Sequence, residues 1–212
     1  MVRKQGALAR ARLYVILDRE VCDYPRLFEI LKQAVGAGVG VVQLRDKISS
    51  SREILTFARY AVAHLKDKIP FIINDRVDLA MASGAAGVHL GHDDLPIADA
   101  RKIMGPKAVI GVSCQTLAYA RLAQKEGADY IGWGSVFKTL TKPDRRPLDL
   151  PALSKDIGKI HIPVFAIGGI DLTNVRQLTG VGIKRIAVTR AICLSKSVRK
   201  TVGQFYEYLG GV

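Results

Sequence analysis

The chain has 212 residues, of which 49% are hydrophobic and 24% are charged, and its formal net charge is +13. This length suits one domain with a sizeable core, and no apolar run approaches the roughly 20 residues of a membrane-spanning helix. The three cysteines lie far apart without a CxxC pair, which argues against a disulfide framework or a zinc cage and predicts a cytoplasmic location. The first residues, MVRKQGALARAR, are basic and lack the apolar segment of a secretory signal. We treat 1–12 as a basic extension that need not be ordered.

Eight short apolar segments recur along the rest of the chain and are the predicted strands. They follow either a basic or proline-marked turn or a glycine-rich segment typical of a helix end. In chain order they are 13–17, 39–44, 70–73, 87–90, 108–112, 130–133, 163–167 and 183–188. Each is apolar throughout, as are strands of a parallel sheet that is covered by helices.

Helical patterns fill the intervals between these strands. Apolar residues recur at spacings of three and four in the segments 25–35, 52–65, 75–82 and 118–125. A further helix is expected to end at 155–159, and the last helical region, 191–209, is expected to break near Ser195. The alternation predicts an α/β fold, a compact single-domain (β/α)8 TIM barrel over residues 13–212. An open doubly wound sheet is the alternative, but the regular alternation favours a closed barrel.

In such a barrel the active site lies at the carboxyl ends of the strands. Polar or glycine residues follow most of the predicted strands, as a purely structural barrel would not require. The candidates are Gln43, Arg45, Asp46 and Lys47; Asn74 and Asp75; His89, His92 and Asp94; Ser113; Thr139, Thr141 and Lys142; Gly169; and Thr189 with Arg190.

The segment 130–144, YIGWGSVFKTLTKPD, predicts an anion site. Two threonine hydroxyls and the ammonium of Lys142 would be grouped at a strand end, where a phosphate could bind. Arg45 and Lys47 alternate in QLRDK, so both can face one side and neutralise a diphosphate. The alternatives are an ordinary threonine-rich connection and a salt-bridged surface loop.

Asp75 and Asp94 end adjacent predicted strands, and their carboxylates could meet at one point. Mg²⁺ prefers oxygen ligands, often one or two carboxylates together with phosphate oxygens of the substrate. Each aspartate could instead cap a helix. A zinc site from His89 and His92 is less favoured, because no third ligand has a suitable spacing.

The positive charge is compatible with nucleic acid or with phosphorylated metabolites. We favour metabolites, because the basic residues are spread along the chain and the aromatic residues form no RNA-binding stripe. Ser113 has no nearby partner for a catalytic triad, so no nucleophile is supported. Two anion subsites beside a metal therefore suggest a transfer in which diphosphate leaves and a second phosphorylated molecule attacks.

The ordered motifs QLRDK, INDRVDLA, GVHLGHDDLP, GVSCQT, YIGWGSVFKTLTKPD and PVFAIGGI resemble the thiamine phosphate synthase family, over residues 13–192. The resemblance implies an enzyme that joins 4-amino-5-hydroxymethyl-2-methylpyrimidine diphosphate to a thiazole phosphate and releases diphosphate. It also implies a dissociative mechanism, in which diphosphate leaves first and the thiazole nitrogen captures the pyrimidine methyl cation. The partners would be these small molecules, with neither nucleic acid nor membrane, and the sequence leaves a monomer and a homo-oligomer both open.

The resemblance assigns roles residue by residue. The pyrimidine diphosphate would be bound by Gln43, Leu44, Arg45, Asp46, Lys47, Asn74, Ser113 and Lys142, and Mg²⁺ by Asp75 and Asp94. The thiazole phosphate would be bound by Thr139, Thr141, Gly169, Val188, Thr189 and Arg190. Arg45, Lys47, Ser113 and Lys142 would be catalytic.

The chain departs from the family pattern at two places. Gln115 stands where the family often has histidine, and Thr189-Arg190 where many members have an aliphatic residue and serine. A related thiazole tautomerase on the same barrel is one alternative, although it generally lacks the TxTK signature kept here. A basic phosphate- or RNA-binding module without catalysis is the other.

Overall fold

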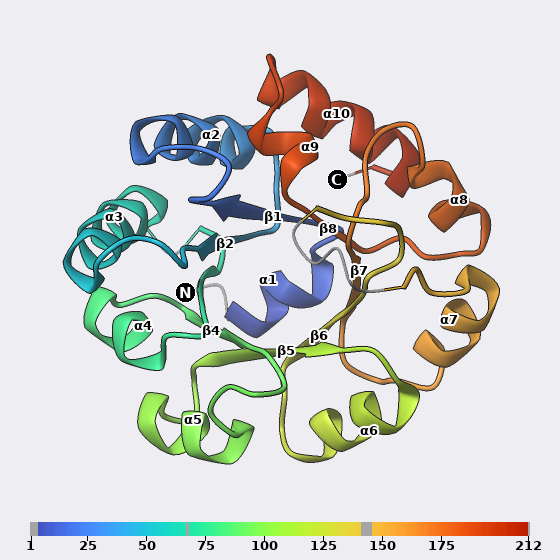
Figure 1. The fold of residues 1–212 in the computed structure, drawn as a ribbon, viewed down its shortest axis with the longest axis horizontal. Helices are drawn as coiled ribbons and strands as arrows, with labels where there is room; N and C mark the ends of the chain where they lie inside the picture. Colours follow the sequence, from blue (N-terminus) through green and yellow to red (C-terminus); the bar gives the residue numbers. More distant parts are fainter. Residues whose placement is uncertain (1–3, 67, 141–145, 212) are drawn as a thin grey trace.

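The computed structural model describes residues 4–66, 68–140 and 146–211, which form a closed barrel of parallel strands surrounded by helices (Figure 1). The strands pair in chain order, and β8 returns to β1 with Val188 opposite Val15. Their bounds are β1 (Leu13–Asp18), β2 (Val41–Arg45), β3 (Phe71–Asn74), β4 (Gly87–Leu90), β5 (Val109–Cys114), β6 (Tyr130–Gly134), β7 (Val164–Ile167) and β8 (Ile186–Val188). The predicted (β/α)8 barrel is confirmed, and the open sheet is excluded by the pairing of β1 with β8.

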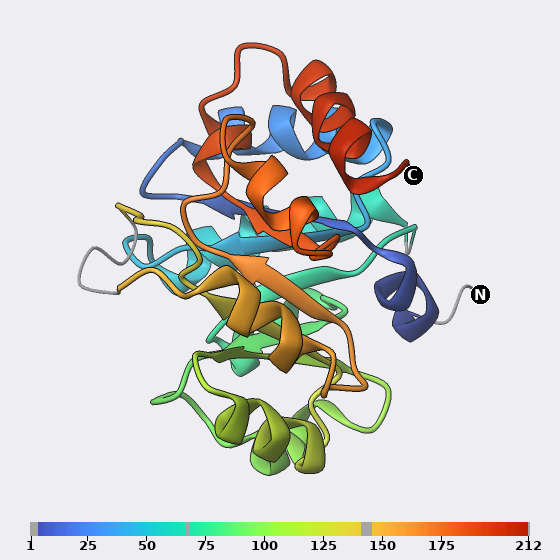
Figure 2. The same ribbon diagram turned by 90° about the vertical axis from the view of Figure 1, so that its right-hand side faces the viewer.

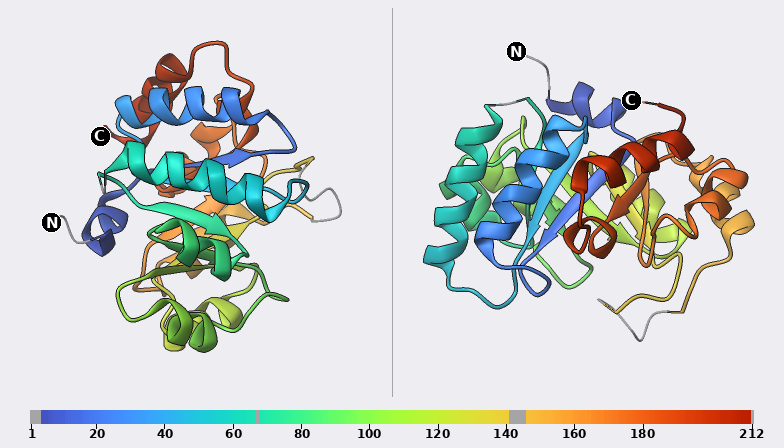
Figure 3. Two further views of the ribbon diagram at one scale, coloured as in Figure 1. Left: turned by 90° about the vertical axis from the view of Figure 1, so that its left-hand side faces the viewer. Right: turned by 90° about the horizontal axis from the view of Figure 1, so that it is seen from above.

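Helices cover the outside of this barrel on all sides (Figures 1 and 3). They are α2 (Tyr24–Gly36), α3 (Ser51–Leu65), α4 (Val77–Ser83), α5 (Ile97–Met104), α6 (Leu117–Lys125), α7 (Leu150–Ile157), α8 (Val175–Gly180), α9 (Arg190–Cys193) and α10 (Val198–Leu209). The break expected near Ser195 is confirmed, because it lies between α9 and α10. Among the described residues, no helix has the length and apolar character needed to cross a bilayer.

The strands separate two hydrophobic cores, because successive side chains point to opposite faces of a strand. In β1, Leu13, Val15 and Leu17 belong to the core between strands and helices. Tyr14 and Ile16 belong to the smaller core inside the barrel. The outer core anchors the helices, and the inner core forms the floor beneath the carboxyl ends of the strands.

The basic start of the chain forms a helix of its own, α1 (Lys4–Arg10), which lies across the barrel at the centre of Figure 1. Leu8 and Ala11 are only 1% and 4% exposed and join the inner core. Residues 4–10 are therefore helical in the structure, and the buried Leu8 holds them on the barrel. Figure 2 shows α1 at one end of the barrel and residues 135–140, which follow β6, at the other. The amino end is thus closed, which leaves the carboxyl end for a site.

Candidate active site

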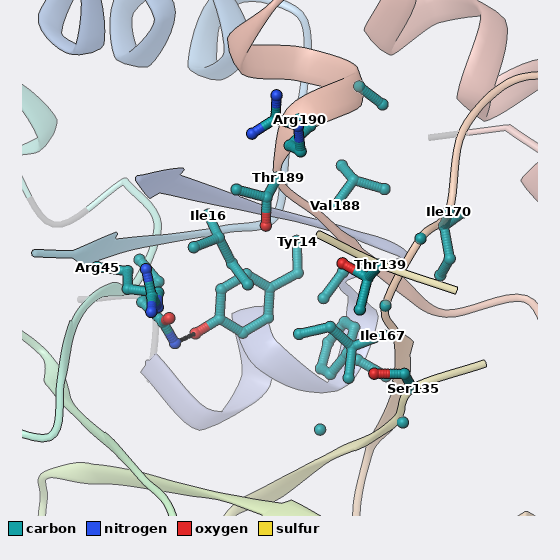
Figure 4. Close-up of a pocket in the computed structure, with 18 of the residues that line it drawn as sticks. Tyr14, Ile16, Arg45, Ser135, Thr139, Ile167, Ile170, Val188, Thr189 and Arg190 are labelled. Atoms are coloured by element: carbon teal, nitrogen blue, oxygen red, sulfur yellow. Dashed lines mark hydrogen bonds between the residues drawn. The ribbon is translucent and has the colours of Figure 1, made fainter. Parts of the chain in front are cut away.

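A cavity of about 380 Å³ opens at the carboxyl ends of the strands (Figure 4). Apolar side chains such as Ile16, Phe165 and Ile167 form part of its wall. Arg45 lies on one side of this view and Thr139 on the other, with Tyr14 between them. The predicted site residues that line the cavity are Gln43, Arg45, Asn74, His89, Ser113, Thr139, Gly169, Val188, Thr189 and Arg190. Most of the candidates that were chosen because they follow a strand therefore line one cavity.

Arg45, the last residue of β2, is held by two carboxylates from the end of β1. Its Nη1 donates to Asp18 at 3.1 and 3.0 Å and also to the carboxylate of Glu20. Asp18 is 1% exposed, and burial raises the pKa of its carboxyl, against the opposing effect of the Arg45 charge. Sequence analysis missed Asp18, although it follows the first strand and the same rule would have selected it. The guanidinium is thus oriented before any ligand binds.

Lys47, Asn74 and Asp75 form a polar cluster where β2 and β3 end. The Lys47 ammonium pairs with Oδ2 of Asp75, and Nδ2 of Asn74 donates to the same oxygen at 2.6 Å. Asp75 adopts a left-handed backbone, with φ of 59°. Its N–H donates to the carbonyl of His89 on β4 at 2.8 Å. These contacts turn the Asp75 carboxylate toward its neighbours on both adjacent strands. Lys47 itself stands beside the cavity rather than in its lining.

Asp75 and Asp94 are brought together, as predicted. Burial raises the pKa of the Asp75 carboxyl, and its hydrogen bond with Asp94 raises it further. Burial also tends to raise the pKa of the Asp94 carboxyl. The hydrogen bonds that Asp94 forms with Asp75 and with the Gly91 N–H, together with the charge of Lys47, outweigh burial and lower this pKa. The Gly91 N–H donates to Oδ2 of Asp94 at 2.6 Å. The hydrogen bond between these carboxyls requires a proton on one of them, and a divalent cation bound between the two would take the place of that proton.

The alternative role of helix capping is wrong for both aspartates. The residue that precedes α4 is Arg76, and the residue that precedes α5 is Pro96; neither helix has a side-chain cap. Neither carboxylate is used to cap a helix, and both aspartates, like Lys47, lie beside the cavity lining rather than in it. Within the described residues, no three or more His, Cys, Asp or Glu side chains are grouped to hold a metal. The two aspartates alone fit Mg²⁺, which usually keeps waters and takes oxygens from a bound phosphate.

A hydrogen-bonded chain of side chains lies inside the barrel beneath the cavity. Gln43 Nε2 donates to the Tyr14 hydroxyl at 2.8 Å, and the Tyr14 and Tyr130 oxygens are 2.8 Å apart. His89 joins Tyr130 through Nδ1 and Ser113 through Nε2, both at 3.0 Å. His89 thus points into the barrel, as expected. Sequence analysis missed the two tyrosines because they sit within apolar runs, and it missed the His89–Ser113 contact because the partners are far apart in the sequence.

The loops after β6 and β7 approach each other too closely for side chains. Gly168 and Gly169 have φ of 105° and 66°. A Cβ on Gly169 would lie 2.3 Å from the Lys138 carbonyl oxygen, and one on Gly168 would lie 2.7 Å from the Cβ of Ser135. The Phe137 N–H donates to the Gly168 carbonyl at 3.0 Å, which holds the two segments side by side. Glycine is therefore required here by both backbone conformation and space.

Other candidates do not reach the cavity lining. Leu44 is 1% exposed and belongs to the core between strands and helices, since its side chain faces away from the barrel interior. Asp46 accepts from the Tyr24 hydroxyl at 2.6 Å and from the N–H groups of Ile48 and Ser49 at 3.0 and 2.9 Å. Its carboxylate therefore organises the turn after β2. Thr141 and Lys142 lie outside the described residues.

The family of the chain follows from comparison with known proteins. Residues 13–192 match the sequence model of the family described as thiamine monophosphate synthase. The chain belongs to the thiamine monophosphate synthase family. The resemblance found in the motifs is thereby confirmed.

Relatives within this family resemble the chain over most of its length. Thiamine-phosphate synthase of Gloeobacter violaceus is 44% identical over 95% of this chain, which spans 58% of that relative's length. The protein of the same name from Ruminiclostridium cellulolyticum is 42% identical over 92% of this chain and 93% of its own. The solved structure of thiamine phosphate pyrophosphorylase from Pyrococcus furiosus is 35% identical, with a TM-score of 0.84, and the match covers 97% and 96% of the two chains. These relatives lend no support to the tautomerase or RNA-binding alternatives.

Proposed function

We propose that this chain is a transferase that condenses 4-amino-5-hydroxymethyl-2-methylpyrimidine diphosphate with a thiazole phosphate to give thiamine phosphate and diphosphate. The observation that carries the proposal, beyond family membership, is the pairing of charges at the carboxyl end of the barrel. Lys47 pairs with Asp75, whose carboxyl adjoins that of Asp94, and Arg45, held by Asp18, lines the cavity at the end of the neighbouring strand β2. A diphosphate with a divalent cation needs both kinds of group.

The pyrimidine diphosphate would bind between β2 and β5. Within the described residues Arg45 makes its bonds through Nη1, so Nε and Nη2 are left for a diphosphate oxygen. Lys47 adds a point charge at the rim, and the side chains of Gln43 and Asn74 line the adjoining wall. Guanidinium groups bind phosphate oxygens in pairs, whereas ammonium groups act as single charges. We assign Lys142 to the same diphosphate on the family resemblance alone.

Mg²⁺ would be held by Asp75 and Asp94 together with oxygens of the diphosphate. When bound, this cation neutralises charge that develops on the leaving diphosphate. Within the protein, Lys47 and Asn74 keep the Asp75 carboxylate turned toward Asp94. The Gly91 N–H does the same for Asp94.

The thiazole phosphate would bind at the other side of the cavity, near β6 to β8. Thr139, Gly169, Thr189 and Arg190 line the wall there, with Val188 beside them. Gly169 lines the cavity without a side chain, so a phosphate can come close to its backbone. The Asn174 side chain donates to the Gly169 carbonyl at 2.8 Å and fixes this turn. We assign Thr141 to the same phosphate on the resemblance alone.

The cavity supports a dissociative reaction better than covalent catalysis. Cys114 is 1% exposed in the outer core, and burial raises the pKa of its thiol to about 12, so it supplies no thiolate. The chain's contribution is to hold the leaving diphosphate with Arg45 and Lys47, to shield the pyrimidine methyl cation among side chains such as Ile16 and Phe165, and to place the thiazole nitrogen in line.

Product analysis tests this function. The purified chain is incubated with the pyrimidine diphosphate, the thiazole phosphate and Mg²⁺, and thiamine phosphate is identified by mass spectrometry. We expect the product only when both substrates and the cation are present. Folded protein that makes no thiamine phosphate would refute the proposal, and isomerisation of a thiazole carboxylate phosphate without the other components would favour the tautomerase.

A further inference from the structure

The buried hydrogen-bonded chain beneath the cavity has a direction that can be worked out by counting donors. It runs from Gln43 through Tyr14, Tyr130 and His89 to Ser113. The two tyrosines are 2% and 0% exposed. Their hydroxyl hydrogens must therefore find acceptors within the protein, because a buried donor without a partner loses its hydrogen bonds to water and gains none in return.

The first part of the chain has one arrangement that satisfies every donor. The Gln43 amide nitrogen can only donate, so the Tyr14 oxygen accepts from it. The acceptor for the Tyr14 hydrogen among the described residues is the Tyr130 oxygen, 2.8 Å away. The reverse direction, from Tyr130 to Tyr14, would leave the Tyr14 hydrogen buried without an acceptor. Tyr14 therefore donates to Tyr130.

The second part follows from the first. Tyr130 accepts from Tyr14, and Nδ1 of His89 lies 3.0 Å from its oxygen, so its own hydrogen is directed to that nitrogen. Burial raises the pKa of both phenols far above their usual value, so each keeps the hydrogen that it donates. With Nδ1 accepting, the imidazole hydrogen is on Nε2 and is donated to the Ser113 oxygen at 3.0 Å. The hydroxyl hydrogen of Ser113 then remains available.

We propose that Tyr14, Tyr130 and His89 are positioning residues that hold the Ser113 hydroxyl as a hydrogen-bond donor toward the cavity. Ser113 lines the cavity. The inference rests on the proposed function for the identity of its acceptor, an anionic oxygen of the departing diphosphate. The same direction excludes a nucleophile and base pair, because the Nδ1 lone pair accepts from Tyr130 and Nε2 already carries a hydrogen. Ser113 thus stabilises charge instead of attacking the substrate.

The tautomer of His89 can be measured without any activity. The chain has four histidines, and His89 alone among them is buried. Two-dimensional ¹⁵N–¹H NMR of ring-labelled protein, with the His89→Gln variant for assignment, is expected to show His89 protonated at Nε2 and unprotonated at Nδ1. A signal from hydrogen on Nδ1 would overturn the proposal. Because no substrate is needed, this result stands even if the proposed synthase reaction fails.

Kinetics of Tyr130→Phe and Ser113→Ala test the functional part. Loss of the Ser113 donor should lower kcat about 100-fold. Tyr130→Phe removes one hydrogen bond from the chain and should lower kcat about tenfold, with KM for the pyrimidine diphosphate nearly unchanged. In the Ser113→Ala background, Tyr130→Phe should have no further effect on kcat. Multiplication of the two losses would show that Tyr130 does not act through Ser113 and would overturn the proposal.

Two further variants separate positioning from general stability. Tyr206→Phe removes another buried phenol hydroxyl, which donates to the Gly38 carbonyl at 2.6 Å outside the barrel. It should lower stability as Tyr130→Phe does while leaving kcat unchanged. His89→Gln keeps an N–H that can donate to Ser113 and should retain more activity than His89→Leu, which keeps none. Equal activity of the two His89 variants would contradict the donor role.

Discussion

Lys47 and Asp75 form an ion pair that joins the ends of β2 and β3 at the rim of the cavity. The pair holds a carboxylate beside that of Asp94, although burial and the second carboxyl both raise the pKa of Asp75. A protein that only needed to be stable would gain little from two adjoining carboxyls. The arrangement is the basis for the proposed Mg²⁺ site.

Asp75→Asn and Asp94→Asn should each lower kcat/KM about 100-fold or more, because a divalent cation contributes several kcal/mol of charge stabilisation in such reactions. Stability should fall modestly at neutral pH, because the substitutions remove a carboxylate that accepts from Lys47 and Asn74 or from the Gly91 N–H. The measurement is activity as a function of Mg²⁺ concentration, with urea unfolding alongside. Asp99→Asn is the control, because Asp99 pairs with Lys102 at 3.0 Å on the surface of α5. Wild-type kinetics in either the Asp75→Asn or the Asp94→Asn variant would contradict the assignment of these aspartates as Mg²⁺ ligands.

Arg45→Lys should raise KM for the pyrimidine diphosphate about tenfold or more, because a lysine keeps the charge but loses the paired N–H groups. The ammonium would also be drawn to Asp18 and Glu20, which hold the guanidinium in the native protein. Arg76→Lys is the matched control: Arg76 also pairs with a carboxylate, that of Asp78, which it binds through Nε and Nη2, and it lies outside the cavity lining. Equal effects of the two substitutions on KM would count against a diphosphate contact by Arg45.

Asp46→Asn should lower stability and leave KM unchanged, because Asp46 holds the turn after β2. Burial tends to raise the pKa of the Asp46 carboxyl, but the hydrogen bonds that it accepts from Tyr24, Ser49 and Ile48 lower the pKa below the ordinary value of 3.8. A depressed carboxyl pKa stabilises the folded state above 3.8, and that contribution is lost as the pH falls through the lowered value. The variant should be about 1 kcal/mol less stable at pH 7. Urea unfolding should show this difference shrinking in acid, and a constant difference would contradict the account.

Gly169→Ala should damage the phosphate end of the cavity. A left-handed backbone costs a residue with a Cβ about 1–2 kcal/mol, and here the Cβ would also meet the Lys138 carbonyl oxygen at 2.3 Å. The loop must shift, so KM for the thiazole phosphate should rise about tenfold as positioned contacts are lost. Gly182→Ala is the control: Gly182 has φ of 85° but no described atom within 4 Å of the added Cβ. The Gly182→Ala variant should be less stable than the native protein, with KM for the thiazole phosphate unchanged. A rise in KM of the same size there would assign the effect to general strain.

The barrel could be predicted because every strand is mainly apolar and most helices end at glycine, so the alternation is visible locally. Helix α1 could not be predicted, because its position depends on the burial of Leu8 against side chains from strands that are distant in the sequence. The helix expected over 52–65 begins one residue earlier, at Ser51. Ser50 precedes it, and the Ser50 hydroxyl accepts from the Glu53 N–H at 3.3 Å.

The only site residues that could be predicted from the residues themselves were those that follow a strand and are polar or glycine. That rule found Asp75 and Asp46 alike, but the sequence contains no sign that Asp46 bonds its own turn while Asp75 faces Asp94. It also overlooked Tyr14 and Tyr130, because aromatic residues inside apolar runs look like ordinary core. Which face of a strand they occupy becomes clear only when the register of the closed barrel is known.

The most direct test of the central claim is a single-turnover experiment with the purified chain, both substrates and Mg²⁺, in which diphosphate and thiamine phosphate are quantified in the same samples. The account predicts that both products appear in equal amounts and that both disappear in the Asp75→Asn, Asp94→Asn double variant. Release of diphosphate without thiamine phosphate, or equal product formation by the double variant, would contradict it.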